Sequence, residues 1–530
     1  MRTIPELFLA AAEAGVTIET DGAIHAAAAI ERQSRALAAG LRDLGVGRGD
    51  RVAAWLPNLP EYLAVQAATA RLGAIMVAVN NRFGAAEVAD IVGRSESKVL
   101  FVADEVRGKR YVDTLAEIGA DALPALGHLA VIGGEAAAPW SRVAAHAYDD
   151  LAAAAPLDTD FSAPDALSNI FTTSGTTAAP KFAAHDQKNV VGHATDVAQV
   201  LEMRAPGTVS MQLLPYCGVF GFVQVIAALA AGAPMVMPTG FDAREAAGLL
   251  IERQATHMLA TDDMLHRLLG PGRELAGTEK PFPSLRAVAF AHFNTYLADL
   301  PARAEALGIP LLAPFGMSEV FSVFSIRRLH QSAEDRHRAG GTLVSASARV
   351  RARDPETGEI LPDGEPGDIE VTGPYLFREY FGNPDATRAA MTEDGYLRTG
   401  DIGYTEPGNA FTYLQRANDT LRLSGFLVNP AEIEAAVMAA PGVSDAQVVA
   451  VGTDKGNRPV AFVIAEAGAE VDEGQVIASV GETLPKFKTP VRVIEVAAFP
   501  VTAGANGTKI QRAKLRQMAE AAMASGAAAE

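Results

Sequence analysis

Helix-like and strand-like segments alternate along most of the chain, and this alternation limits the fold more than any other feature of the sequence. Residues 26–44 have the periodicity of an amphipathic helix, and residues 51–56 are typical of a buried strand. A second helix–strand pair follows at 62–71 and 74–79. The same order returns later, in residues 243–260 and 297–312. Parallel strands joined by helices form sheets covered on both faces, so we expect doubly wound parallel sheets.

The last third of the chain has a different pattern. From about residue 342, short strands and the Asp-Gly and Pro-Gly turns of LPDGEPGD predict a barrel-like or mixed sheet. After residue 416, Asn429 is suited to cap a helix that has Pro430 as its first residue. We therefore predict an α/β protein with two parts. Residues 1–417 form a large N-terminal domain of doubly wound sheets plus a small barrel-like sheet, and residues 418–530 form a smaller α+β domain.

Composition excludes several classes of protein. The net charge of −18 disfavours nonspecific binding to nucleic acid. Cys217 is the one cysteine, so an intrachain disulfide and a cysteine-cluster metal site are excluded, and a reducing cytoplasm is expected. The N-terminus lacks the features of a secretory signal. The apolar run 223–237 is interrupted by Gly232 and Pro234 and is too short to span a membrane, so it predicts a core helix and strand.

A dense run of small and hydroxylated residues lies between a predicted strand and a predicted helix, in the sequence FTTSGTTAAPKF at residues 171–182. Hydroxyl groups, backbone N–H groups and a lysine ammonium are the donors that polyphosphate oxygens need. The spacing of a Walker-type loop is absent. A Ser/Thr-rich surface turn is the alternative. The candidate phosphate-binding residues are Thr173, Ser174, Gly175, Thr176, Thr177 and Lys181.

Four further motifs follow this loop in a fixed order. They are PFGMSE (314–319), GYLRTGD (395–401), QRANDTLRLSGFLVNPAEIE (415–434) and TKIQR (508–512). With the loop, they resemble the adenylate-forming superfamily of acyl-CoA synthetases, peptide-synthetase adenylation domains and luciferases. The resemblance runs over nearly the whole chain, from residue 20 to 518 or so.

The resemblance implies a two-step reaction. A carboxylate attacks the α-phosphate of ATP and releases pyrophosphate, and the acyl group then passes to a thiol such as that of coenzyme A. Both steps crowd negative charge, so cations and aimed hydrogen-bond donors are needed. ATP, Mg²⁺ and coenzyme A are the expected cofactors, and a small carboxylic acid is the expected substrate.

The same resemblance suggests roles for individual residues. Glu319 corresponds to the magnesium-binding carboxylate, and Ser318 keeps a hydroxyl for the α-phosphate. Phe315 stands where a tyrosine usually stacks on adenine. Asp401 resembles the residue that accepts the ribose hydroxyls, with a turn-capping role as the alternative, and Arg416 resembles the arginine that supports ribose and phosphate.

In the C-terminal part, Lys509 is the candidate catalytic lysine, which would bridge carboxylate and phosphate as charge builds. The alternative is a solvated charge, and Thr508 replaces the glycine usual before this lysine, in a loop that looks longer. Asp419 matches the hinge about which the small domain moves. Ser424 and Gly425 match the segment beside the tunnel for the CoA thiol.

Two motifs depart from the family pattern around the nucleotide. Ala178 and Phe182 stand where the phosphate loop normally has glycines, so the geometry of this loop is expected to differ. The sequence AFAHFN replaces a Gly-Gly-Ala adenine loop and brings His292 there. His292 is a candidate for contact with substrate or adenine, and a packed loop histidine is the alternative.

The acyl-pocket motif, LPYCGVFGF, also departs from the family. Gly218 falls where acyl-CoA synthetases carry histidine and peptide-synthetase domains carry an amine-pairing aspartate. Without that carboxylate an α-amino acid substrate is disfavoured, and without the histidine the pocket has more room. Tyr216 and Cys217 are expected to line the same pocket.

These observations predict an ATP-dependent carboxylate–CoA ligase that acts on an apolar aryl or bulky alicyclic acid. Three alternatives stay open: an enzyme that loads an acyl carrier protein, an oxidative luciferase-type enzyme, and a nucleotide-binding homologue with impaired catalysis. We expect a cytoplasmic protein with no membrane span and no nucleic-acid partner, and a homodimer is one candidate assembly.

Overall fold

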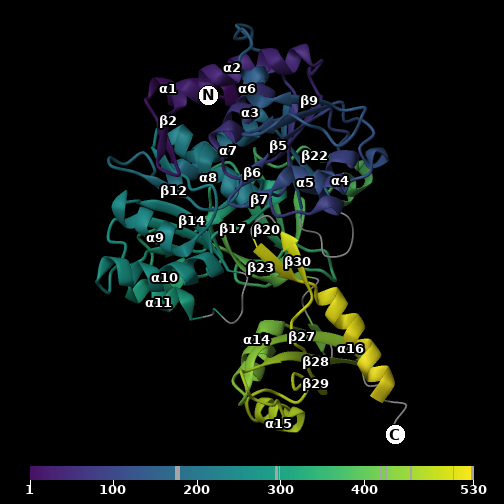
Figure 1. The fold of residues 1–530 in the computed structure, drawn as a ribbon. Coiled ribbons are helices and arrows are strands. Elements are labelled where there is room, and N and C mark those ends of the chain that lie inside the picture. The colour runs from purple at the N-terminus through teal and green to yellow at the C-terminus, as the bar shows by residue number, and fades with distance from the viewer. Residues whose placement is uncertain are drawn as a thin grey trace.

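The structure is a computed structural model that describes residues 1–173, 180–292, 297, 299–417, 421–423, 426–453, 456–504 and 507–526. Two mainly parallel sheets and one antiparallel sheet form the larger N-terminal part. A smaller α+β unit with the C-terminal helix lies at one end of the molecule (Figure 1). The predicted fold class is confirmed, with a large α/β part followed by a small α+β part.

The first sheet has eight strands in the order β22-β11-β10-β4-β3-β5-β8-β9. The six strands from β10 to β9 are parallel. At one edge, β11 pairs antiparallel with β10, and β22 pairs antiparallel with β11. The predicted strands at 51–56 and 74–79 are β3 and β4. In chain order the strands are β3 (Arg51–Trp55), β4 (Ile75–Ala78), β5 (Val99–Ala103), β8 (His128–Ile132), β9 (Ala144–Ala147), β10 (Leu167–Thr172), β11 (Phe182–Asp186) and β22 (Glu379–Tyr380).

The second sheet has seven strands in the order β16-β15-β14-β12-β13-β1-β2, all parallel except the β1–β2 pair. The predicted core helix and strand of 223–237 are α8 (Val219–Ala231) and β13 (Met235–Val236). The other strands are β1 (Thr17–Thr20), β2 (Ala23–Ala26), β12 (Ser210–Gln212), β14 (His257–Thr261), β15 (Ala287–Ala291) and β16 (Leu311–Leu312).

Helices connect and cover these two sheets. Apart from Gln224, helix α8 has only apolar residues and glycine, which suits its packing against α1, α7, β12, β14 and β18. The others are α1 (Ile4–Glu13), α2 (Ala27–Asp43), α3 (Pro60–Arg71), α4 (Ala85–Arg94), α5 (Tyr111–Leu115), α6 (Tyr148–Ala152), α7 (Gln187–Val200), α9 (Ala243–Glu252), α10 (Asp262–Ala276) and α11 (Leu300–Ala306). A short hairpin is formed by β6 (Glu105–Val106) and β7 (Lys109–Arg110).

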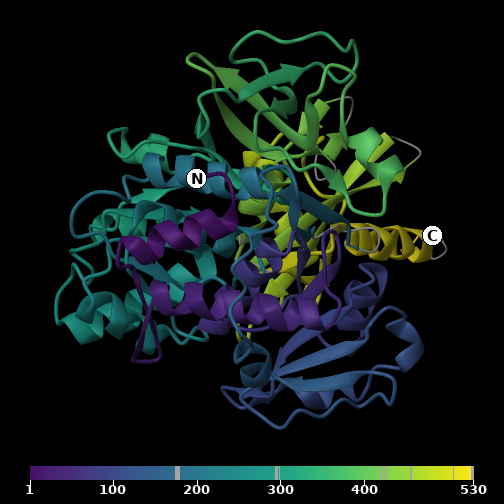
Figure 2. The ribbon, with the colours of Figure 1, turned by 90° about the horizontal axis from the view of Figure 1, so that it is seen from above.

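The third sheet is antiparallel, in the order β17-β18-β19-β24-β23-β21-β20. Its end strands do not pair with each other within the described residues, so it is an open sheet rather than a closed barrel. Figure 2 shows it in green on the opposite side of the molecule from the blue strands of the first sheet. The elements are β17 (Phe315–Met317), β18 (Ser322–Ile326), β19 (Gly340–Leu343), β20 (Arg349–Arg353), β21 (Gly367–Thr372), β23 (Leu397–Glu406) and β24 (Ala410–Arg416), with α12 (Ala333–Arg336) and α13 (Pro384–Ala390).

The C-terminal part has its own buried clusters. None of the core clusters combines described residues up to 417 with described residues from 421 onward. Asn429 caps α14 through its Oδ1, which accepts from the Ala431 N–H at 3.0 Å, as predicted. The elements are β25 (Leu421–Leu423), β26 (Phe426–Val428), α14 (Pro430–Met438), β27 (Val443–Thr453), β28 (Gly456–Ala465), α15 (Glu473–Thr483), β29 (Arg492–Glu495), β30 (Val501–Gly504), β31 (Gly507–Ile510) and α16 (Arg512–Gly526).

Four of the candidate residues follow the carboxyl ends of parallel strands in the first and second sheets. Thr173 follows β10, Gly218 follows β12, His292 follows β15, and Phe315 follows β16. Ligands of open parallel sheets bind outside the carboxyl ends of the strands. The candidate site therefore lies where this class of fold is expected to place it.

Candidate active site

The base of the phosphate loop is a regular hairpin between β10 and β11. The Thr173 N–H donates to the Lys181 carbonyl at 2.9 Å. Phe182 begins β11, pairs with Thr172 and is 3% exposed. It is not among the residues with positive φ, so the strand needs no glycine there. The predicted loop residues Ser174, Gly175, Thr176 and Thr177, and the departure at Ala178, lie outside the described residues.

Lys181 and Glu319 meet through a tyrosine that the motifs did not indicate. Glu319 lies in a 3₁₀ turn, Ser318–Val320, and is 6% exposed. Its Oε1 accepts a hydrogen bond from the Tyr380 hydroxyl at 2.6 Å. The Lys181 ammonium lies 4.7 Å from the centre of the same tyrosine ring. The structure therefore brings together two predicted site residues that lie far apart in the sequence.

A second unpredicted residue holds the neighbouring turn. His185 Nε2 lies 2.8 Å from the Ser318 carbonyl oxygen. His185 is fully buried in β11, and this burial lowers the pKa of its imidazole to about 4. The imidazole is neutral at pH 7, so its Nε2–H donates to the carbonyl. The strand after the phosphate loop thus fixes the turn that carries Ser318 and Glu319.

Asp401 and Arg416 lie opposite each other on β23 and β24. Arg416 Nε is 3.0 Å from Asp401 Oδ1, and its Nη1 donates to the Thr399 carbonyl at 3.2 Å. Asp401 is 2% exposed, whereas the Arg416 side chain is 44% exposed. Asp401 lies inside a strand of ten residues rather than in a turn, and its carboxylate is held by a cation that also reaches solvent.

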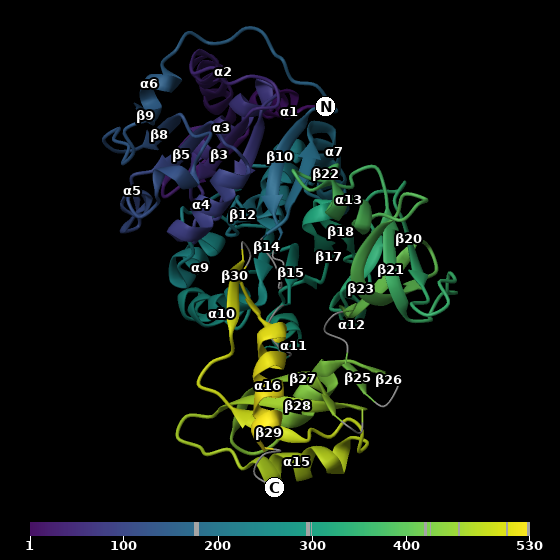
Figure 3. The ribbon, with the colours of Figure 1, turned by 90° about the vertical axis from the view of Figure 1, so that its right-hand side faces the viewer.

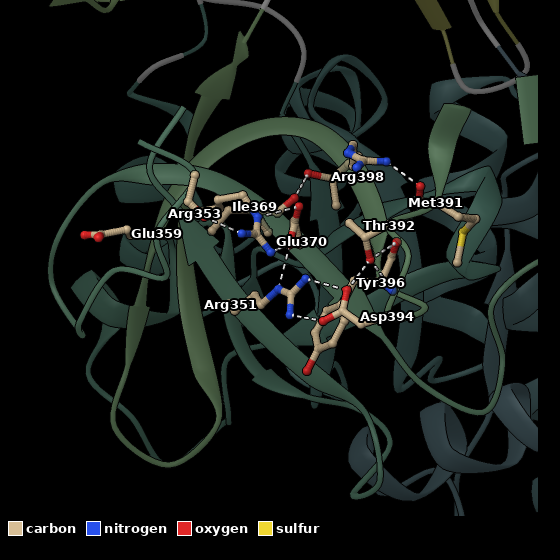
Figure 4. Close-up of polar contacts among 12 residues, drawn as sticks. Arg351, Arg353, Glu359, Ile369, Glu370, Met391, Thr392, Asp394, Tyr396 and Arg398 are labelled. Carbon is tan, nitrogen blue, oxygen red and sulfur yellow. Dashed lines mark hydrogen bonds and ion pairs between the residues drawn. The ribbon is translucent and has the colours of Figure 1, made fainter. Parts of the chain in front are cut away.

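An ionic network joins β20, β21 and the turn before β23 in the third sheet (Figure 4). Arg351 bonds Glu370 at 2.6 Å and Asp394 at 2.6 Å, and Arg353 bonds Glu370 at 3.0 Å. The Arg351 guanidinium lowers the pKa of the Asp394 carboxyl below its usual range. Because β20, β21 and the turn before β23 are joined in this way, the strand that carries Asp401 has a fixed position.

Phe315, the predicted adenine-stacking residue, is 6% exposed in β17. It meets Phe411 edge-on at 5.0 Å between ring centres, and Tyr413 lies 5.7 Å away. The ring therefore belongs to an aromatic cluster of the third sheet, and its stacking on adenine stays a prediction.

The acyl-pocket motif lies at the start of α8. Tyr216 and Cys217 are buried, and the Tyr216 ring packs edge-on against Tyr62 at 5.4 Å. Burial raises the pKa of the Cys217 thiol to about 11, so this thiol stays protonated and is not a nucleophile at pH 7. Gly221, in contrast, must be glycine, because a Cβ there would lie 2.3 Å from the Pro215 carbonyl oxygen.

His292 follows β15 and pairs with an acid that the sequence analysis missed. Its Nε2 lies 3.8 Å from Oδ2 of Asp262, the first residue of α10. Asp262 is fully buried, while the His292 side chain is 39% exposed. Asp262 follows β14, and His292 follows the neighbouring strand β15. The adjacent ends of these two strands are the feature from which the Asp262–His292 contact could have been predicted.

The predicted catalytic Lys509 lies in β31, where it pairs with Thr502 of β30. The segment predicted as a longer loop is thus a β-hairpin, closed at its base by the Gln511 N–H, which donates to the Pro500 carbonyl at 2.8 Å. Figures 1 and 3 both show this hairpin projecting from the small domain toward the large one. The predicted residues Asp419, Ser424 and Gly425 lie outside the described residues.

Comparison with known proteins identifies the family. Family models for the AMP-binding enzyme and for the AMP-binding enzyme C-terminal domain match residues 19–381 and 432–505. The chain belongs to the AMP-binding enzyme family. The predicted membership of the acyl-CoA synthetase branch of the adenylate-forming superfamily is confirmed, and the chain is an AMP-forming acid–thiol ligase.

Several curated relatives of this AMP-binding enzyme are CoA ligases. A 2-hydroxy-7-methoxy-5-methyl-1-naphthoate–CoA ligase of Streptomyces carzinostaticus is 30% identical, over 91% of this chain and 87% of its own length. The 4-coumarate–CoA ligase 5 of Oryza sativa subsp. japonica is 29% identical, over 92% and 88%. The long-chain-fatty-acid–CoA ligase FadD13 of Mycobacterium tuberculosis (strain ATCC 25618 / H37Rv) is 28% identical, over 87% of each chain.

Solved structures agree over the whole length. ATP-bound MatB from Rhodopseudomonas palustris has a TM-score of 0.82 and 26% identity, and the match covers 97% of this chain and 99% of that chain. The anthranilate CoA ligase AuaEII in complex with anthranoyl-AMP also has a TM-score of 0.82, with 22% identity and 98% coverage of both chains, and shows the shared fold. No helix among the described residues is long and apolar enough to cross a membrane.

Proposed function

We propose that this AMP-binding enzyme activates an apolar aryl or bulky alicyclic carboxylic acid with ATP and transfers the acyl group to coenzyme A. The proposal depends on one observation: Tyr380 contacts both Lys181, at the end of the phosphate loop, and Glu319. Adenylation needs a cation and a metal-binding carboxylate at one polyphosphate, and this arrangement supplies both.

The described residues support a place for each part of ATP. Lys181 extends from the end of the phosphate loop and is exposed, so its ammonium can leave the tyrosine ring for phosphate oxygens. Asp401 would accept the ribose hydroxyls, and the exposed guanidinium of Arg416 beside it would support ribose and phosphate. Lys509, on the hairpin that projects toward the large domain, would bridge the attacking carboxylate and the α-phosphate.

Glu319 is suited to a magnesium ion that is shared with ATP. No group of three or more His, Cys, Asp or Glu side chains among the described residues could hold a metal ion by itself. One protein carboxylate combined with substrate phosphates is the usual arrangement for Mg²⁺. With Glu319 Oε1 engaged by Tyr380, the Oε2 atom would be the ligand. When bound, the ion neutralises charge on the phosphate oxygens.

The substrate class rests on the motif at the start of α8. Tyr216 and Cys217 are buried in this region, and Gly218 has no side chain beside them. The named acids of the naphthoate and 4-coumarate ligases are aryl acids, which supports an aryl substrate here. A cytoplasmic location and a homodimer stay predictions from the sequence.

The test is exchange of labelled pyrophosphate into ATP with a panel of carboxylic acids. We expect exchange that depends on an aryl or alicyclic acid, followed by thioester formation with free coenzyme A. Exchange without transfer to coenzyme A but with transfer to an acyl carrier protein would indicate a carrier-loading enzyme. Absence of exchange with every acid, while ATP still binds, would indicate a nucleotide-binding protein and contradict the proposal.

A further inference from the structure

Tyr380 contacts both charged side chains that are expected to meet the phosphates of ATP. Its hydroxyl donates to Glu319 Oε1 at 2.6 Å, and its ring centre lies 4.7 Å from Lys181 Nζ. The side chain is 5% exposed and packs on Phe377, with 4.7 Å between ring centres. A phenol packed in this way has little freedom, so both contacts depend on one rigid ring.

The chemistry of the phenol suits a fixed donor. A phenol hydroxyl has an ordinary pKa of about 10, so it carries its proton at neutral pH and can donate to Glu319 Oε1. A protonated hydroxyl beside an ionised carboxylate donates its proton to one oxygen, and this charge-assisted bond fixes the rotation of the carboxylate. The second oxygen of Glu319 is then presented in one direction.

The backbone around Tyr380 joins the same two regions. Strand β22 pairs with β11, with Tyr380 opposite Ala183. The Phe377 N–H donates to the Glu319 carbonyl at 2.7 Å, and the Arg378 N–H donates to the Ala184 carbonyl at 2.8 Å. The segment before Tyr380 therefore fixes the Glu319 turn against the strand that leaves the phosphate loop.

We propose that Tyr380 is a positioning residue that couples the metal site to the phosphate loop. Its hydroxyl orients Glu319 toward the metal ion, and its ring holds the Lys181 ammonium beside the site until nucleotide arrives. This inference rests on the function proposed above. It predicts that the Tyr380 hydroxyl contributes to metal–nucleotide binding and that the Tyr380 ring determines the position of the Lys181 ammonium.

The test is Tyr380→Phe, which removes one oxygen and keeps the ring on Phe377 and under Lys181. Binding of ATP is measured without any carboxylic acid, so that no reaction occurs. Electron paramagnetic resonance follows Mn²⁺ as a substitute for Mg²⁺, and calorimetry in EDTA follows metal-free ATP. We expect the variant to bind Mn–ATP about tenfold more weakly, since hydrogen bonds to charged groups are among the stronger ones. Metal-free ATP should bind as in the wild type.

The matched control is Tyr375→Phe. Tyr375 is a half-buried tyrosine of the same segment, and its ring contacts His193 at 5.7 Å rather than Glu319. This variant should bind Mn–ATP like the wild type. Equal binding of Mn–ATP by Tyr380→Phe and wild type would overturn the inference. So would equal weakening of Mn–ATP and metal-free ATP, because that result indicates a general loss of structure.

A second variant, Tyr380→Leu, separates the ring from the hydroxyl. It should weaken Mn–ATP binding as the phenylalanine variant does and should also change the binding of metal-free ATP, because Lys181 has lost its aromatic neighbour. If the leucine and phenylalanine variants bind metal-free ATP equally in EDTA, the part of the inference that concerns the ring is overturned. If the wild type itself releases no pyrophosphate with any acid, the proposed function fails, whatever the variants show.

Discussion

At the scale of single residues, Gly218 offers the sharpest test of substrate choice. Its φ of −98° and ψ of 136° are accessible to any amino acid, so a side chain needs no change in these backbone dihedrals. Gly218→His should therefore act through the space that it fills. We expect losses of about ten- to hundredfold in kcat/KM for large aryl or alicyclic acids, and smaller losses for short aliphatic acids. The KM for ATP should not change.

The control for this change is Gly218→Ala, which adds one methyl group and should have a small effect on every acid. Steady-state kinetics with a graded series of acids measures both variants. A uniform loss across large and small acids would contradict the pocket-size argument. Gly221 is not an equivalent position, since any side chain there meets the Pro215 carbonyl.

Some of the site residues could be predicted from the sequence, and others could not. Lys181, Glu319 and Asp401 stand in motifs whose chemistry can be interpreted locally, and the structure places Lys181 and Glu319 around one tyrosine. His185 and Tyr380 could not be found in this way. His185 lies in the short strand β11 and Tyr380 in the two-residue strand β22, outside every motif, and only their spatial neighbours reveal the contacts.

At the scale of elements, a buried ion pair anchors the base of the hairpin that carries Lys509. Glu434 in α14 is fully buried, and its Oε1 lies 2.8 Å from Arg512 Nη1. The same oxygen accepts from the Val448 N–H at 2.9 Å, while Arg512 donates to the Val448 carbonyl at 2.9 Å. Arg512 opens α16 directly after the hairpin. The pair therefore joins α14, β27 and α16 at one point.

Glu434→Gln should weaken this junction, because it replaces the charged carboxylate that faces the Arg512 guanidinium with a neutral amide. Breaking a buried pair typically costs about 3–5 kcal/mol. Hydrogen–deuterium exchange of peptides from β27 and α16 measures the free energy of local opening. The control is Glu432→Gln, two residues earlier on the same helix. Glu432 pairs with Lys488 at 2.7 Å and is 44% exposed. Its loss should cost less than about 1 kcal/mol, and equal effects of the two variants would contradict the argument.

The elements themselves were largely predictable, and the exceptions have a physical reason. The core helix and strand of 223–237 and the capped helix at Pro430 depend on local composition and occur as predicted. The segment before Lys509 was predicted as a loop that is longer than usual in the family, because Thr508 stands where a glycine usually precedes the lysine. Pairing between Val501 and Ile510 nevertheless makes it a hairpin. The pairing of two strands depends on both segments together, so the local sequence of one segment does not predict it.

At the scale of the whole molecule, two separately packed parts share one reaction. Among the described residues, no buried cluster combines the N-terminal and C-terminal parts, so we expect that the small domain can move without breaking a core. The Lys509 hairpin is the part of the small domain that projects toward the large one (Figure 3). This arrangement suits the adenylation step, and we propose that rotation near Asp419 brings another face of the small domain to the thioester step.

Lys509→Ala should therefore divide the two half-reactions. The first step loses a positive charge that acts on the transition state, a contact worth about 3–4 kcal/mol, so acid-dependent pyrophosphate release should fall by two to three orders of magnitude. We expect the second step to depend on this side chain much less. Supplied with chemically prepared acyl-adenylate and coenzyme A, the variant should form thioester at close to the wild-type rate. Rapid-quench measurement of each step gives the two rates separately.

Lys514→Ala is the matched control, because it removes a lysine from the following helix and should leave both steps unchanged. Equal losses in both steps would mean that Lys509 supports the small domain as a whole, and near-normal pyrophosphate release would exclude it from adenylation.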